Sequence, residues 1–158
     1  MKVEVASYTI QATKCDTPFD LKVLKLPSIV DYEYLPNPSK AAIVGATDLA
    51  SIAASRPSFY GVDRAIFDAG GSQLMKDRRR LLQDDPKLVF HRTGSAVITG
   101  PDTYGSLRVP YVIYAFGPNY HTRESDEGDE LLHSAYTSCL MCAKSANLGK
   151  YIVVCAHI

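Results

Sequence analysis

A turn followed at once by a helix is the part of this chain best suited to hold a charged ligand. Gly61 lacks a Cβ atom, so it can adopt a positive φ angle and lets a ligand approach the backbone closely. Apolar residues then recur at helical spacing, at Val62, Ala65, Ile66 and Ala69. The first N–H groups of a helix have no partner within it, and the helix dipole is positive there. The sequence therefore predicts that the backbone of Gly61, Val62 and Asp63 binds a phosphate group.

Two aspartates lie near this turn in the sequence. Asp48 follows the apolar run at residues 41–44, which is typical of a strand buried on both faces, and ligands bind beyond the carboxyl ends of such strands. An ionised aspartate there can accept a hydrogen bond from a ligand hydroxyl. Asp63 stands at the start of the helix, where aspartate also serves simply as a cap. Residue type alone leaves both a ligand role and a capping role open for Asp63.

Other residue types that carry chemistry do not form a recognisable site in this sequence. Cys139 and Cys142 have the spacing of a redox pair or of half a metal site, but they lie within a helical pattern. No second Cys/His pair completes a metal site, so we expect core cysteines, no bound metal and no cofactor. No serine stands in a G-x-S-x-G turn and no lysine follows a glycine loop at P-loop spacing. Serine-nucleophile and P-loop chemistry are therefore not supported.

Hydrophobic periodicity and chain-breaking residues indicate which elements would position these side chains. Strands are predicted at residues 3–10, 21–26, 41–44, 96–99, 111–116 and 151–156. Helices are predicted from residue 62 to the glycines at 70–71, from Ser72 to Pro86, and from Asp126 or Asp129 to Gly149. Residues 49–60 are predicted to be irregular, because Arg56 and Pro57 interrupt any helix that starts there.

Three consecutive arginines, Arg78, Arg79 and Arg80, lie in the second of these helices. Helical spacing puts Arg78 on the inner side with Leu74 and Leu81. Acidic residues flank the run, which favours a solvated helix face over an anion-binding patch.

Composition indicates an ordinary globular protein. The chain has 158 residues, of which 46% are hydrophobic and 22% charged, as expected for a single domain spanning residues 1–158. Lys+Arg and Asp+Glu balance at 17 each, so no bulk positive field attracts nucleic acid. No apolar run is long enough to cross a bilayer, and no membrane association is expected. Reduced thiols and the lack of an apolar leader favour a cytoplasmic or nuclear location.

Segments on both sides of the Gly61 turn resemble, in the same order, motifs of the macro domain family of ADP-ribose-binding modules. Residues 42–48 read AIVGATD where the family has AIVNAAN, and residues 61–71 read GVDRAIFDAGG where it has GVDxAIxxAxG. Residues 93–99 resemble TGxAxIT, and residues 111–118 resemble YVIHxVGP. The resemblance covers roughly residues 41–156. It implies an α/β protein with a three-layer α/β/α fold and a mixed, mostly parallel central sheet.

The resemblance also implies a ligand, namely ADP-ribose, a related ADP-ribosyl metabolite or an ADP-ribosylated protein. Gly61, Val62 and Asp63 would hold the phosphates, with Asp48 and Ile43 as further ligand-binding residues. In the branch of the family that removes ADP-ribose from acidic side chains, the aspartate in the position of Asp63 helps to activate water. Mono-ADP-ribosyl hydrolase activity, with Asp63 as its catalytic residue, is therefore a further expectation.

Two more site residues follow from the resemblance. In the family, an acid after an early strand accepts a hydrogen bond from the adenine amino group. Asp31 is the best match for that acid and Asp16 is the alternative, while a plain surface acid is the simpler interpretation of both. His157 lies at the end of the last predicted strand, near the implied pocket.

The chain departs from the family where the ligand would lie. Gly45 and Asp48 replace the two asparagines of the strand end, and Phe59 and Tyr60 replace two glycines. Residues 1–35 would be extra N-terminal strands, and the second phosphate loop, last strand and final helix of the family would be missing after Ile158. A degenerate macro fold that serves as an interaction or scaffold module is thus the rival function. Such a module is expected to self-associate through its exposed C-terminal strand.

Overall fold

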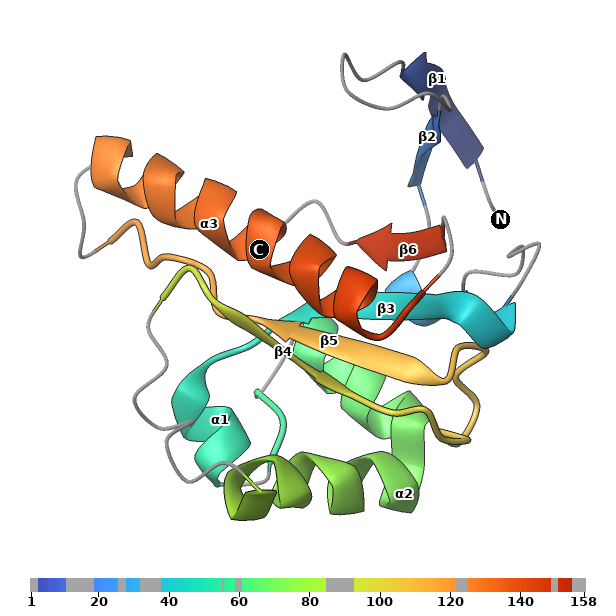
Figure 1. Cartoon of the computed structure of the whole chain (residues 1–158), viewed down its shortest axis with the longest axis vertical. Coiled ribbons are helices and arrows are strands. Elements are labelled where there is room, and N and C mark those ends of the chain that lie inside the picture. Colours follow the sequence, from blue (N-terminus) through green and yellow to red (C-terminus); the bar gives the residue numbers. More distant parts are fainter. Residues whose placement is uncertain are drawn as a thin grey trace.

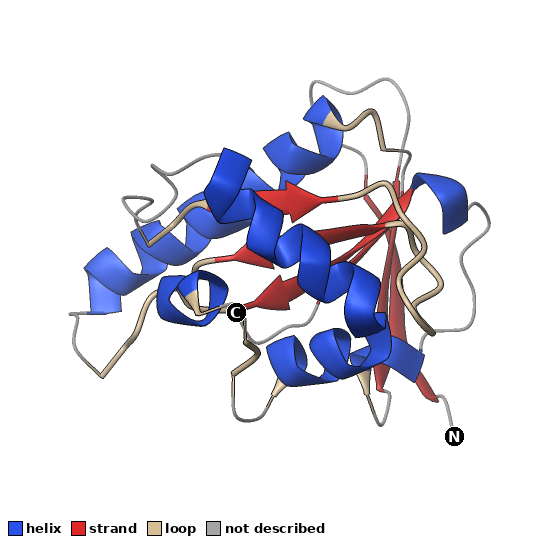
Figure 2. Ribbon diagram, turned by 90° about the horizontal axis from the view of Figure 1, so that it is seen from below, coloured by secondary structure: helices blue, strands red, loops and turns tan. Residues whose placement is uncertain are grey.

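The computed structural model describes residues 3–10, 19–25, 28–31, 38–54, 56–58, 61–84, 93–121, 125–148 and 151–154. A four-stranded sheet forms the centre of these residues, with α2 and α3 on its opposite sides (Figure 1). Viewed from below, the strands lie between layers of helix (Figure 2).

The sheet is mixed and mostly parallel. Its strand order is β4, β5, β3 and β6, with bounds Ala96–Thr99, Tyr111–Ala115, Ala41–Ala46 and Tyr151–Val154. β3 pairs in parallel with β5 and with β6, whereas β4 is antiparallel to β5. The parallel strands bring the carboxyl ends of β3 and β5 to one edge, where Thr47 N–H donates to the Ala115 carbonyl oxygen at 3.0 Å. This sheet confirms the fold predicted from the sequence.

Alternating side chains of β3 fill two separate cores, because successive residues of a strand point to opposite faces. Ala41 and Ile43 belong to the core that includes Ile66 of α2 (Val62–Asp84). Ala42 and Val44 belong to the core that includes Cys139 and Ala143 of α3 (Ser125–Ser145). A strand buried on both faces explains the uninterrupted apolar run at residues 41–44.

α2 consists of two helical segments joined at Gly71. This glycine has φ 63° and ψ −157°, which is outside the helical region. The sequence predicted a helix end at residues 70–71 and a second helix after Ser72, and the structure confirms this division. The break lets the two halves of one chain segment follow the sheet in different directions (Figure 1).

A short helix, α1 (Leu49–Ala53), lies where the sequence predicted irregular chain, so that prediction was wrong for these residues. Asp48 caps the helix by accepting a hydrogen bond from Ser51 N–H. Capping satisfies backbone donors that would otherwise lack partners, which allows so short a helix to form.

α3 is tied to the start of β4 by hydroxyl groups. Ser134 and Ser138 both donate to the Gly94 carbonyl oxygen, at 2.9 and 3.0 Å.

Burial raises the pKa of the Cys139 thiol to about 12 and raises that of Cys142 as well. Both cysteines pack in the core on this side of the sheet, as predicted.

The N-terminal strands form a sheet of their own. β1 (Val3–Ile10) pairs with β2 (Phe19–Lys25) in an antiparallel two-stranded sheet apart from the central one (Figure 1). Two short 3-10 helices follow, η1 (Ile29–Asp31) and η2 (Pro38–Lys40), and η1 packs against α2. In the described part of the chain, no helix is long and apolar enough to span a membrane.

Candidate functional site

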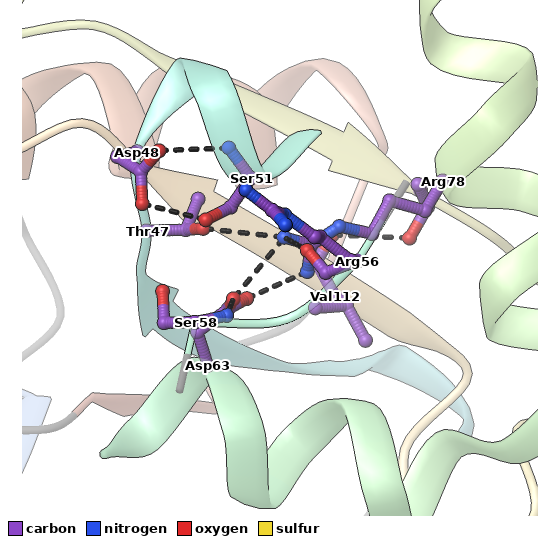
Figure 3. Close-up of polar contacts among 9 residues, drawn as sticks. Thr47, Asp48, Ser51, Arg56, Ser58, Asp63, Arg78 and Val112 are labelled. Carbon is purple, nitrogen blue, oxygen red and sulfur yellow. Dashed lines mark hydrogen bonds and ion pairs between the residues drawn. The ribbon is translucent and has the colours of Figure 1, made fainter. Parts of the chain in front are cut away.

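The predicted site lies at the carboxyl end of β3, where the chain enters α1 and then α2. Figure 3 shows the residues whose polar groups meet there: Thr47 and Asp48 after β3, Ser51 in α1, Arg56 and Ser58 in the segment between the helices, and Asp63 and Arg78 in α2. We call residues 56–58 the rim segment.

Gly61 has the backbone conformation that the sequence predicted. Its φ angle is +87°, and no heavy atom of the described residues outside its immediate chain neighbours lies within 4 Å of the position that a Cβ atom would take. A positive φ, and not crowding, is therefore what favours glycine here. The Gly61 carbonyl oxygen accepts from Ala65 N–H at 3.1 Å, which closes the first turn of α2. No described residue accepts a hydrogen bond from the N–H groups of Gly61 and Val62.

Asp63 is buried, with an exposed fraction of 2%. Its Oδ1 atom accepts from Arg78 Nη1 at 2.6 Å, and its Oδ2 atom accepts from Arg78 Nη2 at 3.1 Å. Oδ2 also accepts from the backbone N–H of Ser58 at 2.8 Å. The carboxylate is thus held in a two-point ion pair with an arginine and tied to the rim segment.

Arg78 is the residue of this site that the sequence analysis did not identify. It is fully buried, so the prediction of a solvated face for the arginine run was wrong for Arg78, whereas Arg79 and Arg80 are exposed as expected. Its helical spacing with Leu74 and Leu81 was the one available signal.

The guanidinium of Arg78 also bonds to groups other than Asp63. Nη2 donates to Thr47 Oγ1 at 3.3 Å and to the Arg56 carbonyl oxygen at 3.0 Å. The group lies 5.0 Å from the centre of the Tyr114 ring and 5.6 Å from that of Phe67, in cation–π contact with both.

Asp48 differs from Asp63 because it is exposed. Its Oδ1 accepts from Ser51 N–H at 2.7 Å and its Oδ2 from Ser51 Oγ at 2.6 Å. Partial burial raises its pKa, but the hydrogen bonds from Ser51 and the Ala50 N–H, with the positive charge of Arg78, lower the pKa overall. The carboxylate is therefore ionised at neutral pH, and its free lone pairs can still accept from a ligand hydroxyl.

The β3 residues Ile43 and Gly45 lie beneath α2. Ile43 is buried in the core shared with Ile66. A Cβ atom on Gly45 would lie 2.7 Å from Ile66 Cδ1, closer than such atoms approach. A larger residue at this position, such as the asparagine of the family motif, would therefore require the Ile66 side chain to shift.

Of the remaining predicted residues, the structure describes only Asp31. Asp31 is exposed at the end of η1, and no hydrogen bond or ion pair joins its side chain to another described site residue. His157, Asp16, Phe59 and Tyr60 lie outside the described residues.

A shallow hollow of about 280 Å³ lies at the other end of the sheet. Thr99, which lines it, pairs with Val112 near the start of β5, away from the Thr47 end. Acidic side chains of α2 contribute to its wall, among them Asp77 and Asp84. Within the described ranges, no group of three or more His, Cys, Asp or Glu residues could hold a metal ion.

Comparison with known proteins gives a consistent result. The macro domain family model matches residues 57–156. A macro domain-containing protein of Cupriavidus necator is 42% identical over 90 residues, which are 57% of this chain and 48% of that protein. One from Caldanaerobacter subterraneus is 39% identical over 88 residues, which are 56% of this chain and 46% of that protein. The chain spans about half the length of these relatives.

The fold is also that of solved macrodomains. The Oceanobacillus iheyensis macrodomain, solved with ADP, superposes with a TM-score of 0.66 at 22% identity, covering 91% of this chain and 65% of the other. The same protein with MES bound gives a TM-score of 0.67. With a family match over more than half its length and this shared fold, the chain belongs to the macro domain family.

Proposed function

We propose that this protein binds ADP-ribose or a closely related ADP-ribosyl group, with the diphosphate held by the backbone at the start of α2. The observation that carries the proposal is the Gly61 turn, with its φ of +87° and the open space beside it. The backbone N–H groups at this turn have no acceptor among the described residues, so they can donate to a phosphate group. The positive end of the helix dipole adds to the attraction. Family membership supports the proposal, as does the ADP found with a structurally similar macrodomain.

Other parts of the site take supporting roles in this proposal. The exposed, ionised carboxylate of Asp48 accepts from a ribose hydroxyl. Ile43 and Val62 provide packing beneath the phosphate turn.

Titration calorimetry with ADP-ribose tests the binding proposal. We expect saturable heat from the folded wild-type protein and at least tenfold weaker binding by Gly61→Val, because valine disfavours the positive φ angle. Arg64→Ala, an exposed change in the same turn of helix, is the matched control and should bind as the wild type does. No heat at millimolar ADP-ribose from a folded sample would reject the proposal.

We propose binding, and not hydrolysis, as the main activity. The Asp63 carboxylate accepts from Arg78 and Ser58 and has little exposed surface, so it is poorly placed to take a proton from water. Incubation with a protein automodified on acidic side chains should therefore release no ADP-ribose above the uncatalysed rate. Release that disappears in Asp63→Ala, while ADP-ribose binding is kept, would instead establish the hydrolase function.

A further inference from the structure

Arg78 links the segments that surround the proposed phosphate turn, although they are far apart in the sequence. Its guanidinium contacts Thr47 after β3, the Arg56 carbonyl of the rim segment, and Asp63 in the first turn of α2 (Figure 3). With an exposed side-chain fraction of 1%, it cannot itself reach a bound ligand.

The hydrogen bonds fix the turn from both sides. The Asp63 carboxylate holds the Ser58 N–H at 2.8 Å, so the rim segment is anchored to the first turn of α2 just before and after Gly61. Arg78 orients that carboxylate through two bonds of 2.6 and 3.1 Å. Two-point arginine–carboxylate pairs constrain geometry as well as adding energy, which a single ammonium group cannot do.

Charge compensation is a second consequence of this placement. An unpaired carboxylate at Asp63 would put a buried negative charge beside the incoming diphosphate. The Arg78 guanidinium neutralises it, and its positive charge also helps to lower the pKa of Asp48. The ion pair therefore leaves no uncompensated charge at Asp63 to repel a diphosphate.

The ion pair is not the arrangement that packing alone would favour. Arg78 Nε is buried, and no described residue accepts a hydrogen bond from it. Replacing a buried ion pair by apolar side chains of similar volume is often neutral or stabilising. A buried arginine with an unused donor is better explained by the geometry that it imposes on its neighbours.

We propose that Arg78 is the positioning residue of the phosphate-binding turn: its guanidinium holds Asp63, the rim segment and the end of β3 in the arrangement that accepts a diphosphate. This inference rests on the proposed function for the identity of the ligand. We call the hydrogen-bonded group of Arg78, Asp63, Thr47 and the rim segment the clamp, and its effect on the turn can be measured without a ligand.

Hydrogen–deuterium exchange of the unliganded protein tests the clamp directly. Arg78→Lys keeps the charge but loses the two-point pair. Within residues 56–65, the hydrogen-bonded amides of Arg56, Ser58 and Ala65 should exchange about tenfold faster, while those of α3 stay unchanged. Arg79→Lys, its exposed neighbour, should match the wild type throughout. Unchanged exchange at residues 56–65, or equal acceleration in α3, would overturn the proposal.

Calorimetry on the same variants tests the consequence for binding. Loss of the two-point pair should weaken ADP-ribose binding by about tenfold in Arg78→Lys and leave Arg79→Lys unaffected. If the wild type binds and Arg78→Lys binds equally well, Arg78 has no positioning role and the proposed function stands. If the wild type does not bind ADP-ribose, the proposed function fails. Arg78 then has no role in positioning a diphosphate site, even if the exchange data show that it holds the turn.

Discussion

Asp48 and Asp63 lie on either side of the rim segment and perform different physical tasks. Asp48 is exposed, caps α1 and has a lowered pKa. Asp63 is buried and paired with Arg78. Two identical side chains in one site thus differ in whether a ligand can reach them, and this difference decides which of them can bind a hydroxyl.

The cap at Asp48 makes stability depend on pH. Because its folded-state pKa is below the ordinary aspartate value of 3.8, its contribution is present above that value and is lost as the pH falls through the folded-state pKa. Asp48→Ala should lower the free energy of unfolding by about 1 kcal/mol at neutral pH, and by less in acid. Urea denaturation of the wild type and of Asp48→Ala, from neutral pH into acid, measures the difference in unfolding free energy. An equal loss at all pH values would contradict the prediction.

The buried pair at Asp63 should matter far more than the exposed pair one turn away. Asp63→Ala leaves Arg78 as an unpaired buried charge, which should cost about 3–5 kcal/mol of unfolding free energy. In the same helix, Asp68 accepts a hydrogen bond from Arg64 at 2.6 Å, and both side chains are exposed, that of Arg64 by 49% and that of Asp68 by 55%. Asp68→Ala should therefore cost less than about 1 kcal/mol of unfolding free energy. Denaturant unfolding compares the two variants, and similar losses would show that burial of the Asp63 pair has no special weight.

At the scale of elements, the start of α2 is determined by its contact with the end of β3. The helix packs so closely on the strand that Ile66 Cδ1 occupies the space a side chain at Gly45 would need. A side chain at position 45 would therefore require Ile66, a residue much later in the chain, to shift.

This contact can be tested by paired substitutions. Gly45→Ala should destabilise the protein by about 1–2 kcal/mol, because the added methyl group forces Ile66 from its position. Ile66→Val removes the Cδ1 atom and should make the double variant no less stable than Ile66→Val alone. Thermal unfolding of the set provides the measurement, and simple additivity of the two losses would rule out the contact as the cause.

The sequence predicted those elements whose signals are local. The break at Gly71, the strand at residues 41–44 and the helix start after Gly61 each depend on nearby residues alone. α1 was missed because five residues give too little periodicity, although Asp48 was a capping signal. The role of Arg78 could not be predicted, since its partners lie 15 to 31 positions away and only the fold brings them together.

At the scale of the whole molecule, two features of the described chain are suited to contact a partner. Among the described strands, β6 pairs only with β3. On α3, Leu140 and Met141 have exposed fractions of 61% and 64%. Open strand edges and exposed apolar side chains both favour association.

We propose that the protein self-associates through the edge of β6. Sedimentation velocity should show a dimer whose population increases with concentration. The double substitution Leu140→Lys and Met141→Lys should leave this dimer intact, because the backbone edge of β6, and not the exposed face of α3, forms the contact. A dimer abolished by these lysines would assign the contact to α3, and a monomer at all concentrations would exclude self-association.

The internal neutralisation of Arg78 has a consequence for the solution conditions under which a ligand is recognised. A site that holds phosphate through free lysine or arginine side chains loses affinity as counterions accumulate. The Arg78 guanidinium is already matched to a carboxylate and shielded from solvent. It should therefore add little salt-dependent attraction for an anionic ligand, and its effect on affinity should persist at ionic strengths that screen exposed charges.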